Sequence, residues 1–139
     1  MSAHPSTLYS ETVLAHNRAP KNCGSLVDAT HHGVAENAMC GDHLKLSFRV
    51  HGNVIAAAMF DGDSCAITTA SASMLTEALR GASPARIAEL REEMLMMFRA
   101  GPLARDDFAA FADLCHHPAR QRCALLPFDA AIAALQTKE

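Results

Sequence analysis

Several residue types and patterns are scarce in this chain of 139 residues. It has no tryptophan, one tyrosine and six phenylalanines, so an aromatic surface on which nucleic-acid bases stack is not expected. Neither sign of charge dominates, because 12 Lys and Arg side chains oppose 15 Asp and Glu side chains, for a formal net charge of −3. This balance argues against nucleic acid or an anionic membrane as the partner.

Long apolar runs are lacking as well. The longest clearly apolar stretch is residues 54–60, which is far shorter than the roughly 20 residues that cross a bilayer. The first nine residues show no basic segment followed by an apolar run, so no secretory signal is expected. We therefore predict a cytoplasmic protein without membrane contact, folded as a single domain over residues 1–139.

Cysteine is the residue type that the chain has in excess. There are five cysteines, and none of them forms a Cys-x-x-Cys pair. An odd number without an export signal makes a disulfide framework a poor explanation, and metal binding or thiol chemistry a better one. Without further evidence the alternative stays open that these cysteines are small buried hydrophobic residues.

The hydrophobic pattern predicts an α+β fold. Residues 44–50 alternate between apolar and polar, and a turn at residues 51–53 leads to a second strand at residues 54–60, followed by a loop at residues 61–64. An edge strand is expected around residues 25–29. Helices are predicted at residues 8–17, 66–80, 84–100, 106–115 and 123–136. This order indicates a small antiparallel sheet of about three strands packed against several α-helices.

Helical spacing also predicts which side chains face the core. Leu8, Thr12, Val13 and Ala15 are expected inward on the first helix. On the last helix the inward residues are expected to be Leu125, Phe128, Ile132 and Leu135.

Three cysteines fall where one element is predicted to give way to the next. Cys40 and Asp42 form a Cys-Gly-Asp element just before the first clear strand, Cys65 opens a helix, and Cys123 opens the last helix. Such junctions can bring several ligands to one point. Three thiolates and one carboxylate make a tetrahedral zinc set, and the softness of sulfur also allows iron. A helix N-terminus favours the thiolate, so a lowered thiol pKa is expected for Cys65 and Cys123.

Three motifs in this order resemble the iron–sulfur scaffold family of IscU and the NifU N-terminal domain. They are Cys40-Gly41-Asp42, residues 60–77 around Cys65, and residues 118–126 around Cys123. Residues 8–9 and 16–22 resemble the N-terminal helix of the family and the turn after it. Arg122 stands where the IscU branch has histidine, and residues 92–114 look like the helical insertion of the SufU branch, so the chain looks like a SufU-type member.

The resemblance implies a zinc site and a sulfur-transfer role. It assigns Cys40, Asp42, Cys65 and Cys123 as the zinc ligands, and Cys40 as the acceptor of persulfide sulfur from a cysteine desulfurase of the SufS type. Delivery to downstream cluster-assembly or acceptor proteins follows. The chain is then a zinc-dependent, sulfurtransferase-like carrier rather than a stand-alone enzyme. The alternative is a scaffold that binds iron and a transient [2Fe–2S] cluster on Cys40, Cys65 and Cys123 at the same Cys/Asp site.

Several polar residues near these motifs have two interpretations. Arg120 either hydrogen-bonds a thiolate or Asp42, or is a solvated residue at a helix start. Asp42 is otherwise a turn residue that caps a strand. The sequence Cys115-His116-His117 is expected to be a helix end rather than a second metal site, because adjacent histidines on a helix point apart. The sequence shows no Cys–His motif or oxyanion loop that would support a cysteine hydrolase. An inert structural zinc domain is an alternative that the sequence still allows.

Overall fold

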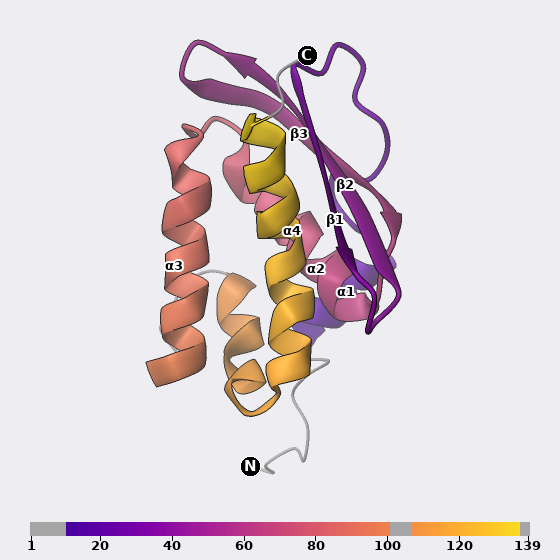
Figure 1. Cartoon of the computed structure of the whole chain (residues 1–139), viewed down its shortest axis with the longest axis vertical. Coiled ribbons are helices and arrows are strands. Elements are labelled where there is room, and N and C mark those ends of the chain that lie inside the picture. The colour runs from indigo at the N-terminus through magenta and orange to yellow at the C-terminus, as the bar shows by residue number, and fades with distance from the viewer. Residues whose placement is uncertain (1–10, 101–106, 137–139) are drawn as a thin grey trace.

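The computed structural model describes residues 11–100 and 107–136 of the chain. Figure 1 shows a sheet with helices gathered on one of its faces. In chain order the elements are α1 (Glu11–Arg18), β1 (His31–Asn37), β2 (Asp42–His51), β3 (Val54–Asp63), α2 (Ala66–Leu79), α3 (Ala85–Ala100), the 3₁₀ helix η1 (Asp107–His116) and α4 (Pro118–Gln136). The α+β prediction of about three strands and several helices is confirmed.

The sheet is antiparallel throughout, in the order β1-β2-β3. The predicted alternation in β2 is present, because Leu44, Leu46 and Phe48 are fully buried on the helix-covered face. Two expected boundaries were wrong. β2 begins at Asp42 itself, and β3 continues through residues 61–63, which pair with His43 to Lys45 instead of forming a loop. The β2–β3 hairpin therefore extends to the Cys40-Gly41-Asp42 motif.

The edge strand was predicted in the wrong place. Residues 25–29 form no strand, and β1 lies at His31–Asn37 instead. Its inward residues are small. A Cβ on Gly33 would collide with the backbone of Ala130 and Ala134 in α4, so glycine is required where helix and strand touch.

The helix next to the sheet presents small side chains. The inward face of α4 includes several alanines, and Ala130, Ala131 and Ala134 are fully buried. Leu125, Ile132 and Leu135, which were predicted to point inward, are only half-buried, whereas Phe128 is buried as expected. Close approach between α4 and β1 explains the difference, because large side chains do not fit between a helix and a strand that touch at Gly33.

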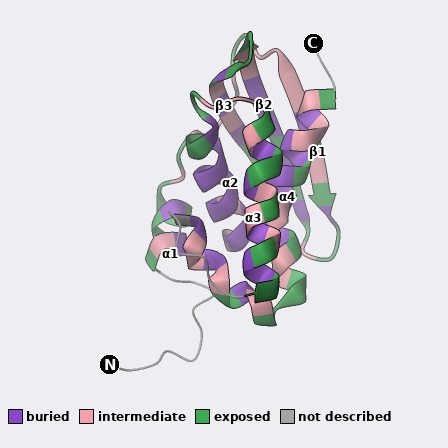
Figure 2. Cartoon of the chain, turned by 90° about the vertical axis from the view of Figure 1, so that its left-hand side faces the viewer, coloured by how far each residue is buried: buried purple, intermediate pink, exposed green. Residues whose placement is uncertain are grey.

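The centre of the molecule is α2. Ten of its 14 residues are buried, and Figure 2 shows this helix as a nearly continuous buried segment between the sheet and the other helices. Its apolar residues at helical spacing are all buried, namely Ile67, Ala70, Met74, Leu75 and Leu79. Burial on this scale makes α2 a rigid platform for the residues at its N-terminus.

The first helix matches its prediction only in part. Val13 is fully buried on α1, but Ala15 is exposed, and Leu8 lies outside the described residues. The inward polar residue is His16, whose Nδ1 lies 2.7 Å from Ser73 Oγ on α2. A polar contact thus holds α1 where an apolar stripe was expected.

The last helix begins earlier than predicted. It starts at Pro118 rather than near Cys123, because proline is well suited to the first helical position, where no N–H is needed. The predicted short helix before it is the 3₁₀ helix η1, with Phe108 and Phe111 buried. Within the described parts of the chain, no helix is both long enough and apolar enough to cross a membrane.

Candidate metal and sulfur-transfer site

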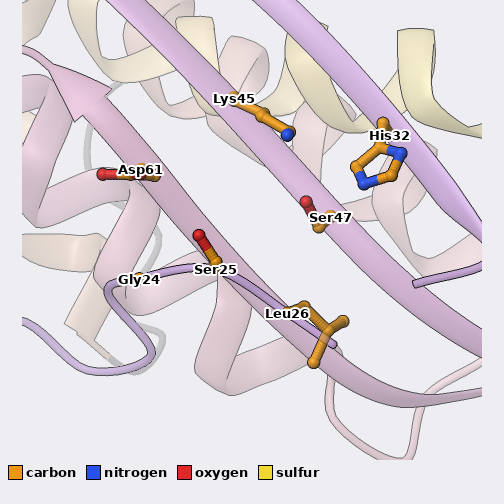
Figure 3. A pocket seen from close by; sticks show the side chains of 7 residues that line it. All are labelled: Gly24, Ser25, Leu26, His32, Lys45, Ser47 and Asp61. Atoms are coloured by element: carbon orange, nitrogen blue, oxygen red, sulfur yellow. The ribbon is translucent and has the colours of Figure 1, made fainter. Parts of the chain in front are cut away.

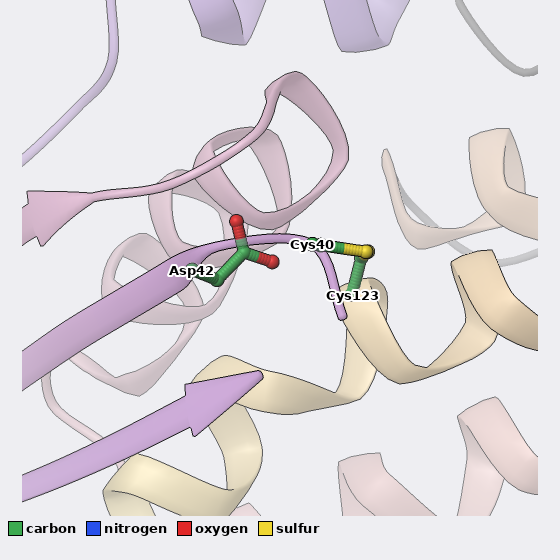
Figure 4. Close-up of side chains that lie close together, drawn as sticks. All are labelled: Cys40, Asp42 and Cys123. Carbon is green, nitrogen blue, oxygen red and sulfur yellow. The ribbon is translucent and has the colours of Figure 1, made fainter. Parts of the chain in front are cut away.

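Cys40 lies on the turn that joins β1 to β2. The register ends with Asn37 opposite Asp42, so residues 38–41 form the connection. The N–H of Cys40 donates to the carbonyl of Asn37 at 3.1 Å. Gly41 has a φ of +72°, a left-handed conformation that glycine adopts without strain. This turn projects the Cys40 thiol from the hairpin toward the start of α4 (Figure 4).

Asp42 is held by the N-terminus of α2. Its carboxylate is buried, with 3% of the residue exposed. The N–H of Cys65 donates to Asp42 Oδ1 at 2.7 Å, and the hydroxyl of Thr68 lies 2.8 Å from Oδ2. Cys65 is the N-cap of α2, but its own side chain makes no capping bond. Asp42 therefore acts as the cap from a neighbouring strand, where its charge is stabilised by the helix dipole.

Cys123 lies in the second turn of α4, opposite Cys40. The two Sγ atoms are 3.3 Å apart, and Figure 4 shows them meeting beside the Asp42 carboxylate. Two polar residues lie beside this pair. Arg120 Nη1 lies 4.0 Å from each sulfur, and the buried Asn37 places its Nδ2 4.0 Å from Cys123 Sγ. The thiol pair thus lies between an amide donor and a guanidinium group.

The pKa values of the Cys65 and Cys123 thiols are shifted in opposite directions. The pKa of Cys65 is lowered from 9.0 to about 6, first because Cys123 donates a hydrogen bond to it, and then because Thr68 does. The lowered pKa expected for Cys65 is confirmed. The same expectation for Cys123 was wrong. Its pKa is raised, first because it is the hydrogen-bond donor to Cys65 and then because it is buried.

The donor set fits a zinc ion. Ligand atoms of Cys40, Asp42 and Cys123 all lie within 4.8 Å of one another. Cys65 Sγ lies 3.8 Å from Asp42 Oδ2, so the fourth predicted ligand borders the cluster without belonging to that tight group. Thiolate sulfur and carboxylate oxygen are zinc ligands in tetrahedral sites. The structure brings the four residues to one place, and their role as ligands stays a prediction.

The other candidate residues do not join this cluster. Among the described residues, no second group with metal-ligand spacing is found. Cys23 is exposed and Cys115 is half-buried. His116 and His117 are both exposed at the end of η1, as expected for a helix end.

Two residues of the site were missed from sequence. Asn37 and Thr68 are buried polar residues whose partners lie 86 and 55 residues away along the chain, so no local spacing indicates them. Thr68 follows Cys65 by three residues, and a hydroxyl one turn into a helix is a signal that points only to local capping. Both are polar groups in the core with a defined hydrogen-bond partner, as buried polar groups require.

A hollow opens beside Cys40. Its volume is about 250 Å³, and it is lined by Asn37, Met39, Cys40, Pro118, Ala119 and Arg122. Met39 is 79% exposed, the highest value among the large apolar side chains that the structure describes. A neighbouring hollow shares Asn37 and Arg122 and extends along α4. The cysteine site is thus reachable from the surface on the Cys40 side.

Comparisons with known proteins agree with this architecture. The family model of the NifU-like N terminal domain matches residues 8–116. The zinc-dependent sulfurtransferase SufU of Bacillus subtilis is 29% identical over 133 residues, covering 93% of this chain and 90% of SufU. The iron–sulfur cluster assembly scaffold protein IscU of Thermotoga maritima is 33% identical and covers 93% of each chain.

Solved structures point the same way. A putative iron–sulfur cluster assembly scaffold protein for the SUF system from Fervidobacterium islandicum superposes with a TM-score of 0.84 at 26% identity, covering 95% of this chain and 99% of that one. A NifU-like N-terminal protein from Brucella abortus shares the fold, with a TM-score of 0.83 at 21% identity. On these matches and on the fold, the chain belongs to the NifU-like N-terminal domain family, the iron–sulfur cluster assembly family of IscU and SufU.

Proposed function

We propose that this chain is a zinc-binding sulfur carrier of the cytoplasm. In this role Cys40 accepts sulfur from the persulfide of a cysteine desulfurase, of the SufS type, and passes it toward proteins that build or receive iron–sulfur clusters. The Cys40 thiolate attacks the outer sulfur of the donor persulfide. One S–S bond forms on Cys40, the S–S bond of the donor breaks, and the donor cysteine leaves as a thiolate. No net oxidation occurs, so no further reactant is needed.

The position of Cys40 is the observation that supports this assignment. It is half-buried, on a turn beside the hollow lined by Met39 and Pro118, whereas Cys123 opposite it is fully buried. A cysteine that receives sulfur from another protein must be reached by that protein's persulfide. Among the three cysteines of the cluster, Cys40 combines such access with Arg120 Nη1 at 4.0 Å from its sulfur.

The metal role rests on the donor set. Cys40, Asp42, Cys65 and Cys123 would hold zinc, which supplies charge that keeps the cysteines deprotonated and the four segments together. Asp42 is positioned for this by its two hydrogen bonds to α2. The name of the Bacillus subtilis relative, a zinc-dependent sulfurtransferase, supports zinc as the metal.

Intact-mass spectrometry tests the sulfur step directly. The zinc-loaded protein is incubated with a SufS-type desulfurase and cysteine, and then alkylated. We expect a gain of one sulfur atom, located on the peptide that contains Cys40, and its loss in Cys40→Ser. Cys23→Ser is the matched control, because Cys23 is exposed and lies outside the site. Sulfur gained equally by Cys40→Ser would contradict the proposal.

A second candidate is a scaffold that assembles a cluster on the same residues. It is favoured by the 33% identity to the Thermotoga maritima protein, which carries the scaffold name. Metal analysis of protein purified without oxygen separates the two. One zinc per chain without colour supports the carrier, and iron with sulfide and a brown colour supports the scaffold. A protein that contains neither zinc nor iron would contradict both proposals and would leave an inert or metal-free domain.

A further inference from the structure

The hydroxyl of Thr68 lies at the junction of three of the four proposed ligands. It is 2.8 Å from Asp42 Oδ2, 3.3 Å from Cys65 Sγ and 3.1 Å from the carbonyl oxygen of Cys123. These residues belong to β2, to the N-cap of α2 and to α4. Thr68 is itself completely buried. One side chain therefore touches every element of the site except the turn that carries Cys40.

We propose that Thr68 is a positioning residue that keeps Asp42, Cys65 and Cys123 assembled as a fixed half-site, on which Cys40 can leave and return. The inference rests on the proposed function, since it assigns the part of the zinc site that remains when Cys40 carries sulfur. Thr68 touches no metal in this assignment. It acts through the ligands that it orients, as hydrogen-bonding residues behind metal ligands do.

The Asp42 carboxylate shows how the half-site is fixed. Oδ1 accepts from the Cys65 N–H and Oδ2 lies within hydrogen-bond distance of the Thr68 hydroxyl, so the plane of the carboxylate is set from two sides. A single hydroxyl proton serves Oδ2 or the Cys123 carbonyl at one time, and the carboxylate is the stronger acceptor. Without that hydroxyl, Oδ2 keeps only the Cys65 thiol at 3.8 Å, and the carboxylate is held mainly through Oδ1.

Cys40 differs from the other three residues. It is placed by the turn bond to Asn37, and Gly41 beside it has open space around it. No contact joins Cys40 to Thr68 in the described structure. Three of the proposed ligands therefore share contacts with one buried hydroxyl, whereas the fourth, Cys40, lies on a surface turn.

Ser71 provides a closely matched control. It is also fully buried on α2, one turn after Thr68, and its hydroxyl donates to the carbonyl of Ala124 at 2.6 Å. Both hydroxyls thus link α2 to neighbouring carbonyls of α4. Only Thr68 also contacts Asp42 and Cys65. A difference between substitutions at the two positions isolates the contacts with the ligands from the contact between helices.

The test measures zinc affinity by competition with a chromophoric chelator, together with the visible spectrum of the Co²⁺-loaded protein. Thr68→Val keeps the size of the side chain and removes the hydroxyl. We expect its zinc affinity to fall roughly 10- to 100-fold, the effect typical of residues that orient ligands. Its Co²⁺ bands should lose the intensity of a tetrahedral site. Thr68→Ser should restore both, and Ser71→Ala should stay within about twofold of the parent.

A second comparison keeps the result independent of Cys40. In a Cys40→Ser background the fixed half-site should still bind zinc, and adding Thr68→Val should abolish that binding. Thermal unfolding of each metal-free variant is compared with that of Ser71→Ala, and if Thr68→Val does not fold, Thr68→Ala replaces it. Unchanged affinity and Co²⁺ spectrum in a folded Thr68 variant would overturn the inference. No zinc binding by the parent protein would instead overturn the proposed function.

Discussion

The two faces of the sheet carry polar groups in different ways. On the helix-covered side, at the end of the sheet, Asp42 is buried and both of its carboxylate oxygens are within hydrogen-bond distance of α2 donors. On the opposite face a small hollow of about 50 Å³ lies under the segment before β1 (Figure 3). It is lined by Gly24, Ser25, Leu26, His32, Lys45, Ser47 and Asp61.

Both places contain a carboxylate near other ligand-type side chains, but only one has the character of a site. The charged and imidazole side chains of the outer hollow come from neighbouring positions of the sheet, since Lys45 lies opposite Asp61 and His32 opposite Ser47. Cross-strand pairing by itself produces such neighbours. The cysteine site instead combines residues from a turn, a strand and two helices. Convergence from separate elements therefore distinguishes a candidate metal site from an ordinary sheet surface.

The sharpest test replaces the aspartate on each side. Asp42→Ala removes a proposed ligand and leaves the Cys65 N–H without its acceptor, so we expect zinc affinity to fall at least about 100-fold, equivalent to about 2.7 kcal/mol. Asp61→Ala on the outer face should leave zinc affinity unchanged. Chelator competition measures both. Equal losses would mean that the two carboxylates serve one extended site.

The next test compares packing on the two faces of β1. Gly33→Ala places a methyl group against the backbone of α4, and we expect it to destabilise the fold by about 2 kcal/mol, as overpacking does. Val34 on the outer face is 49% exposed, so Val34→Ala should cost less than about 1 kcal/mol. Denaturant unfolding of the metal-free proteins measures the difference. A tolerated Gly33→Ala would show that α4 can move away from the strand.

The sequence indicates the strong patterns of this fold and misses the weak ones. Alternation over residues 44–50 predicts β2 correctly, because large apolar side chains face the core there. β1 escapes because its inward positions are Gly33, the half-buried Ala35 and Asn37, and small or polar residues give no alternating signal. Their burial depends on the approach of α4, nearly a hundred residues later, which no local window contains.

The candidate site likewise has features that the sequence shows and features that depend on tertiary packing. The motifs around Cys40, Cys65 and Cys123 are visible in the sequence. The structure groups Cys40 and Cys123 with Asp42, and it places Cys65 beside Asp42. The lowered pKa expected for Cys123 assumed that it starts a helix, whereas α4 begins at Pro118. The hydrogen bond to Cys65 and burial, which raise its pKa, come from tertiary packing. Thr68 was missed because its contacts are set by tertiary packing.

Alkylation of the metal-free protein compares the two helix-borne thiols. The pKa of Cys65 is lowered to about 6, so above that pH it is mostly thiolate and reacts with iodoacetamide, whereas Cys123, with its raised pKa, reacts far less. We expect a reaction midpoint for Cys65 near pH 6. In Cys123→Ala the main hydrogen bond is lost, so the midpoint should move upward. Peptide mapping after a pH series checks both. A midpoint unaffected by Cys123→Ala would show that Thr68 or the helix start is the dominant cause.

The smallest effect is expected from the exposed pair next to the site. His43 Nδ1 lies 2.6 Å from Glu36 Oε2 across the strands, but the two side chains are 56% and 66% exposed. Solvent and salt screen such pairs, so Glu36→Gln should change the free energy of unfolding by less than about 0.5 kcal/mol. Zinc affinity should not change, even though His43 follows Asp42 directly. No buried contact joins Glu36 to the cysteines in the described structure, so no effect on zinc is expected. A marked loss of zinc affinity in this variant would extend the metal site onto the outer face and remove the distinction between the two faces.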